Sequence, residues 1–127
     1  RGGRTRVRAA LLFVLAISLY PSFAGAQEPA LIAQGAMIRT LDRVSGRTVD
    51  FEFTPGQRHE IGKLQIEMSE CRYPVDNPSG DAYAQLVIRE QATPEPVFQG
   101  WMIASSPAIS ALDHARYDVW VLRCIIS

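Results

Sequence analysis

The two cysteines are the residues of this sequence with the most definite chemistry. Cys71 and Cys124 are the only cysteines among the 127 residues. Neither stands in a Cys-x-x-Cys spacing and neither has a histidine beside it, so a reactive thiol or a metal pair is the weaker alternative. In an exported protein two such residues predict a disulfide. That bridge would close a loop of 54 residues, which stabilises a fold by about 4 kcal/mol in the chain-entropy model.

His114 is the residue with the best case for acid–base chemistry. Asp113 and Asp118 flank it, and Ser105, Ser106 and Ser110 stand nearby in sequence. A Ser-His-Asp arrangement is therefore conceivable, but a triad is defined by geometry and not by closeness along the chain. The G-x-S-x-G elbow is also absent. The preferred interpretation places His114 at the end of a short helix, where a cation favours the negative end of the dipole.

Metal and cofactor chemistry has little support in the sequence. His59 lies in the polar stretch GQRHE and is interpreted as a surface residue without the clustered ligands that zinc needs. The calcium-loop pattern and the phosphate-binding glycine loop are missing as well. We therefore expect no metal, no cofactor and no enzymatic activity.

The segment 98–120 is the best candidate for binding chemistry. It concentrates aromatic and apolar side chains, namely Phe98, Trp101, Met102, Ile103, Ile109, Leu112, Tyr117 and Trp120. Aromatic residues and methionine are favoured at interfaces, although a small β core also needs them. We take Trp101, Met102 and Tyr117 as the predicted interaction surface.

The first 26 residues have the order of a signal peptide. Four arginines give a basic start, an apolar run follows at 9–20, and Ala24-Gly25-Ala26 supplies a small-residue site. A membrane anchor is the alternative, but 12 residues of helix cover only about 18 Å of a roughly 30 Å bilayer core. We expect cleavage near Ala26 and a mature protein in the periplasm, with no membrane span of its own.

The charge that remains after this segment argues against some partners. All 13 acidic residues follow residue 26, whereas four of the 13 basic residues precede it. Nine basic residues against 13 acidic ones leave a net charge of −4, which disfavours binding to nucleic acid. About 100 residues form one domain with a modest core, expected at 36–127 behind a flexible tether at 27–35.

Alternating apolar and polar residues predict the elements that must position these side chains. Strands are expected at 37–44, 48–53, 63–68, 82–89, 97–103 and 117–124, separated by turns rich in proline and glycine. The interval 72–81 contains two prolines and is expected to be a loop. The last strand has two apolar faces, one with Val121 and one with Trp120 and Cys124, which predicts a central position.

The fold class follows from this series of short strands. Ser106 as N-cap and Pro107 at the first helical position predict one helical turn reaching towards His114. Together these features predict an all-β fold, a small antiparallel sandwich or barrel of about six to eight short strands, with one short helical turn and one disulfide.

Two stretches of sequence resemble a known family. LDRVSGR at 41–47 and GWMIASSPAISALDHARYDVWVLRC at 100–124 are similar to motifs of the alphaproteobacterial exported family catalogued as domain of unknown function 2155. The resemblance covers essentially the whole chain after the signal peptide. It implies a non-catalytic accessory or assembly protein that docks on an inner-membrane complex at its periplasmic face, with respiratory complex I as the candidate.

Two other functions compete with this expectation. The first is a free periplasmic binding module for a peptide, a cell-wall fragment or a small ligand, with its groove beside the loop at 72–81. The second, ranked last, is a hydrolase built around His114. The segment 98–120 favours the accessory protein over both.

Overall fold

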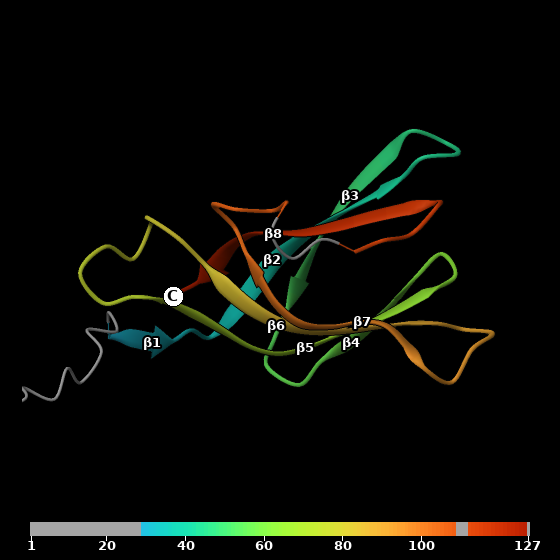
Figure 1. Ribbon diagram of the computed structural model, residues 1–127. Helices are drawn as coiled ribbons and strands as arrows, with labels where there is room; N and C mark the ends of the chain where they lie inside the picture. The colour runs from blue at the N-terminus through green and yellow to red at the C-terminus, as the bar shows by residue number, and fades with distance from the viewer. Residues whose placement is uncertain (1–28, 109–111, 127) are drawn as a thin grey trace, which may run out of the picture.

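The protein is a two-sheet antiparallel structure. The computed structural model describes residues 29–108 and 112–126. They form eight strands: β1 Ala30–Ile32, β2 Gly35–Asp42, β3 Arg47–Phe53, β4 Arg58–Ile61, β5 Leu64–Pro74, β6 Tyr83–Glu90, β7 Pro96–Ile103 and β8 Tyr117–Ile125 (Figure 1). Every pairing between them is antiparallel. The predicted all-β sandwich is confirmed.

Five strands make the first sheet and three make the second. The first has the order β1-β5-β6-β7, and β4 pairs with the start of β5 on the edge where β1 pairs with its end. The second has the order β3-β2-β8. β2 contacts β5, and β8 contacts β5, β6 and β7, so the sheets pack against each other (Figure 1).

The core lies between the two sheets. Strict alternation turns Leu64, Ile66 and Met68 of β5 inward, and β6 does the same with Leu86 and Ile88. The second sheet contributes further side chains that are fully or almost fully buried, namely Ile38, Phe53, Val119 and Val121. The period-two pattern of these strands is therefore explained by one buried and one exposed face.

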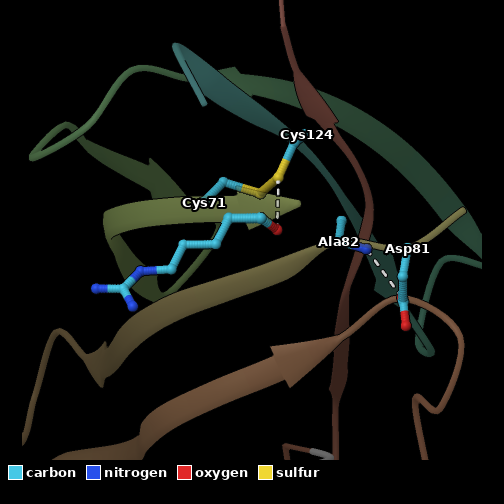
Figure 2. Close-up of a disulfide and its surroundings, with 5 residues drawn as sticks. Cys71, Asp81, Ala82 and Cys124 are labelled. Atoms are coloured by element: carbon cyan, nitrogen blue, oxygen red, sulfur yellow. Dashed lines mark hydrogen bonds between the residues drawn. A yellow bond between two sulfur atoms is a disulfide. The ribbon is translucent and has the colours of Figure 1, made fainter. Parts of the chain in front are cut away.

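The predicted disulfide between Cys71 and Cys124 is confirmed. It joins β5 of the first sheet to β8 of the second, with 5.8 Å between the two Cα atoms (Figure 2). Both cysteines are buried in the core, with exposed fractions of 0% and 7%. The bridge therefore links the two layers directly.

A β-bulge precedes each cysteine and determines where it points. Alternation from Met68 would turn Cys71 outward, but Ser69 is an extra, unpaired residue of β5 opposite β6. Likewise Leu122 is an extra residue of β8 opposite β2. Each bulge absorbs one residue, so both cysteines face the core.

This geometry corrects two expectations about the last strand. Cys124 does not share a face with Trp120, because the bulge turns it inward together with Val121. β8 is also an edge strand rather than a central one, because within the described residues it pairs only with β2. The side chain of Trp120 on the outer face of β8 is half-buried beside Pro107 and Ala108 of the β7–β8 connection. This contact explains why β8 has a second apolar face.

Three segments are more ordered than the sequence predicted. Part of the expected tether at 27–35 forms β1, and the backbone N–H of Ala33 donates to the carbonyl of Cys71. β5 continues through the expected loop as far as Pro74, and the polar stretch before Ile61 forms β4. β1 and β4 are held by backbone hydrogen bonds to β5. Such bonds involve no side chains and therefore require no hydrophobic alternation in the sequence.

The expected helical turn before His114 is not seen in the described part of that connection. Pro107 and Ala108 lie in a turn, and Leu112 to His114 have no regular structure. Residues 109–111 lie outside the described residues. His114 is therefore held by side-chain contacts rather than by a helix end.

The end of the sandwich away from the disulfide is closed by Tyr117. Its hydroxyl accepts a hydrogen bond from the backbone N–H of Lys63, at 3.2 Å, and so connects β8 to the β4–β5 turn. Gly62 makes this approach possible. It has a φ of +59°, and a Cβ at this position would lie 2.4 Å from the Tyr117 hydroxyl.

We expect Gly62→Ala to destabilise the protein more than Gly46→Ala. Both glycines have positive φ, which costs an alanine about 1–2 kcal/mol, but a Cβ at Gly46 meets nothing within 4 Å. Gly62→Ala must in addition displace Tyr117 and its hydrogen bond, worth about 1 kcal/mol. Urea denaturation measures both variants. Equal losses of unfolding free energy would show that the Tyr117 contact contributes nothing.

Within the two described ranges, no helix has the length and apolar character needed to cross a membrane.

Candidate functional site

The structure separates the three residues of the predicted interaction surface. Met102 is 3% exposed and Tyr117 is 4% exposed, so both belong to the core. Trp101 is half-buried on the opposite side of β7 from Met102. Met102 and Tyr117 are therefore corrected from surface to core residues, and only Trp101 is available to a partner.

The neighbours of Trp101 form a coherent surface on the outside of the first sheet. The strand register places Ile32, Arg72, Tyr83 and Ile103 in one row across β1, β5, β6 and β7. The next row contains Glu70, Gln85 and Trp101. Side chains directly opposite one another share a face. We call Ile32, Arg72, Tyr83, Trp101 and Ile103 the outer aromatic face.

Arg72 is held in position at the centre of this face. Its guanidinium lies 5.2 Å from the centroid of the Trp101 ring, and its Nη2 donates to Oε1 of Glu70 at 2.8 Å. The stacked arrangement is a cation–π contact across β6. An arginine fixed in this way loses less conformational entropy when it binds a partner.

Part of the exposed apolar surface lies beside these residues. Ile32 on β1 is 64% exposed and Val75 just after β5 is 39% exposed, whereas Leu31 faces the other side of β1 and Val44 lies in the β2–β3 turn. The other end of the same sheet is polar, with Arg58 paired to Glu67. The outer aromatic face is thus a bounded patch, the arrangement expected of a binding surface.

His114 does not form a catalytic triad in the described structure. Its Nε2 contacts Oε1 of Glu90, while its Nδ1 accepts the backbone N–H groups of Arg116 and Tyr117 at 3.0 and 3.2 Å. The ring therefore ties the end of β6 to the start of β8. This is a structural role.

The other candidates for that triad also have different partners. Asp118 accepts two hydrogen bonds from the guanidinium of Arg43. Ser105 donates to the carboxylate of Asp81, which also accepts the backbone N–H of Ala82 (Figure 2). Ser110 lies outside the described residues.

Ion pairs surround the segment before β8 and shift the pKa values of their members. Two hydrogen bonds from the guanidinium of Arg116 lower the pKa of Asp42 below its ordinary value of 3.8. Arg39 lowers the pKa of Asp50 in the same way. These carboxylates are therefore ionised throughout the neutral range. The Asp42 pair joins the β2–β3 hairpin to the segment before β8, whereas the Asp50 pair joins β2 to β3 within the hairpin.

His59 is less exposed than the sequence predicted. It is half-buried in β4, where its Nε2 donates to the carbonyl of Glu52 and its ring packs against Phe53 with 4.6 Å between centroids. Over residues 29–108 and 112–126, no group of three or more histidine, cysteine, aspartate or glutamate side chains could hold a metal ion.

The expected groove beside 72–81 corresponds to a small hollow of about 250 Å³. It is lined by Pro29, Pro74, Val75, Asp76, Asn77, Gly80, Asp81 and Tyr83. The hollow adjoins the outer aromatic face through Tyr83. Arg72 is not predicted as a surface residue of a strand, because the two prolines of 72–81 indicate a loop. Tyr83 lies in the strand predicted at 82–89, but its own segment carries no sign of its neighbours on β5 and β7.

The comparisons with known proteins agree with the motifs. The model of the family described as "Uncharacterized protein conserved in bacteria (DUF2155)" matches residues 36–124. An uncharacterized protein of Rickettsia prowazekii (strain Madrid E) is 26% identical over 90 residues, which are 68% of this chain and 58% of that protein. The chain thus spans little more than half the length of this relative. It matches no solved structure. Since the family model covers well over half of the sequence, the chain belongs to the DUF2155 family.

Proposed function

We propose that this is a non-catalytic accessory or assembly protein that works in the periplasm and docks on an inner-membrane complex through the outer aromatic face. Respiratory complex I is the partner that the family resemblance implies. The observation that carries the proposal is the stacking of Arg72 on Trp101 in an otherwise open sheet face.

The composition of the face supports protein binding. Tryptophan, tyrosine and arginine dominate the residues whose truncation weakens protein complexes, and all three are adjacent here. Arg72 is already desolvated on one side by the Trp101 ring. A partner that covers this pair would complete the desolvation, which strengthens both contacts.

The position of the face also supports docking. It lies on the open side of the first sheet, whereas the other side of that sheet is buried in the core. A rigid sheet joined by a disulfide presents its side chains without rearrangement, and preorganisation of this kind lowers the entropic cost of association.

The test is native gel electrophoresis of inner membranes solubilised in a mild detergent. The tagged protein is expected to migrate with complex I. Trp101→Ala and Arg72→Ala should each weaken the association by about 2 kcal/mol, or roughly 30-fold. Migration of the tagged protein alone, while complex I remains intact, would overturn complex I as the partner.

The second tryptophan provides the matched control. Trp120 is also half-buried, but it lies on the outside of the second sheet. Trp120→Ala should leave the association unchanged. A loss with Trp120→Ala but not with Trp101→Ala would instead place the docking surface on the second sheet.

A further inference from the structure

We propose that the free edge of β3 binds an extended peptide segment of a second protein, with an apolar side chain of that segment in the hollow beside this edge. The site is separate from the outer aromatic face, so the inference goes beyond the proposed function. It would make the protein an adaptor that docks through one sheet and captures a peptide through the other.

The backbone of β3 has one unpaired edge in the described structure. β3 pairs only with β2. The carbonyl of Val49 points towards β2, since it accepts the hydroxyl of Thr40, whereas the carbonyl of Glu52 points the other way and accepts Nε2 of His59. Backbone groups alternate between the two sides of a strand, so those of Thr48 and Asp50 point outward, as the carbonyl of Glu52 does.

These outward groups make no hydrogen bond to another backbone group among the described residues. His59 occupies only the Glu52 position, at the Phe53 end of the strand. From Thr48 to Asp50 the edge is open, and in Figure 1 the β2–β3 hairpin projects beyond the first sheet. An extended segment could add there as a fourth strand of the second sheet, the mode known as β-augmentation.

A hollow of about 430 Å³ lies on the inner side of this edge. Its apolar walls come from Val49 and Phe51 of β3, Ile61 of β4 and the ring of Tyr117. The first three are only half-buried. The volume is in the range of ligand pockets, about 300–1,000 Å³. A strand added to β3 directs alternate side chains inward, so one apolar side chain would enter the hollow.

One charge at the rim specifies a neighbour of that side chain. Arg47 lines the hollow from the same side of β3 as Val49 and Phe51, and it has no ion-pair partner in the described part of the chain. Asp42, also at the rim, is already paired with Arg116. The occupant should therefore carry an acidic residue near Arg47, on the same side of its strand as the apolar residue.

The direction of the segment follows for an antiparallel pairing. Arg47 begins β3 and Phe53 ends it. An antiparallel strand starts near Phe53 and ends near Arg47. The acidic residue would therefore follow the apolar one.

The first experiment selects peptides from a phage-displayed library of random linear heptapeptides on the purified chain with its disulfide formed. We expect enrichment of sequences in which an apolar residue is followed two positions later by an acidic one. Selected peptides are synthesised and their binding is measured by fluorescence anisotropy. Absence of any enriched sequence would overturn the proposal.

Two variants test the edge and a third separates this site from the outer aromatic face. Thr48→Pro removes an outward N–H, which is the position where an edge strand tolerates proline, and should weaken binding at least about tenfold. Thr48→Ala keeps that N–H and should bind normally. Trp101→Ala should also bind normally, so failure of the docking proposal does not affect this result.

N-methylation of the peptide tests strand addition directly. In an added strand only alternate amides face β3, so methylation of one set should abolish binding and methylation of the other should not. Equal effects of both sets, or normal binding by a folded Thr48→Pro variant, would contradict strand addition. The intact disulfide and the circular dichroism spectrum report whether Thr48→Pro is folded.

Discussion

Reduction of the Cys71–Cys124 disulfide is expected to lower the free energy of unfolding by about 4 kcal/mol. The cysteines are 53 residues apart in sequence, and opening a loop of this size restores that much conformational freedom to the unfolded chain. A domain of this size has about 5–15 kcal/mol of stability in total. Urea denaturation with and without dithiothreitol measures the difference.

A double variant, Cys71→Ala with Cys124→Ala, controls for other effects of the reductant. It should have the stability of the reduced protein, less the cost of the lost sulfur packing, and should not respond to dithiothreitol. If the oxidised and reduced wild-type proteins unfold at the same urea concentration, the bridge does not stabilise the fold.

Deletion of Glu67 is expected to lower the free energy of unfolding by about 2–5 kcal/mol, whereas deletion of Ser69 should leave the stability and the disulfide-bonded fold intact. Glu67 lies in the regular part of β5, between the buried side chains of Ile66 and Met68. Without it, β5 can keep its pairing with β6 only by losing the bulge at Ser69. Met68 would then turn outward and Ser69 would take its buried place, at a cost of about 2–5 kcal/mol, while Cys71 would still face the core.

Ser69 provides the matched deletion two residues further along. It is exposed and has no partner in β6, because Met68 pairs with Leu86 and Glu70 pairs with Gln85. Without it the alternation becomes regular and Cys71 still faces the core. Urea denaturation distinguishes the two deletions, and alkylation of free thiols after purification reports whether the disulfide forms in each. Free thiols in the Ser69 deletion would show that the bulge itself positions the cysteine.

The strands could be predicted from the sequence wherever alternation is strict. Val49, Phe51 and Phe53 mark β3, and Leu64, Ile66 and Met68 mark the first half of β5. The pattern fails where a bulge inserts one residue, since local periodicity carries no sign of the partner strand. The bulge at Leu122 is why alternation alone places Cys124 on the outer face, whereas the loop predicted at 72–81 follows from its prolines.

The candidate site was only partly predictable for a related reason. Trp101 was recognised because tryptophan is common at interfaces, but so were Met102 and Tyr117, which the core uses. Adjacent residues of a strand face opposite sides, so Trp101 and Met102 could not both be exposed. Ile103 lies on the same strand as Trp101, but Ile32, Arg72 and Tyr83 come from three other strands, and their proximity depends on a register that no single segment contains.

The bridge between the layers also determines how the protein behaves under mechanical tension. The segment from Cys71 to Cys124, with a sequence separation of 53, would add about 180 Å to the length of a fully extended chain, and the covalent link prevents all of this extension. A force applied at the two ends therefore peels β1 and the β2–β4 region from the remainder but cannot stretch the segment that carries Trp101. If the protein were tethered between two moving partners, the length of that segment would stay constant.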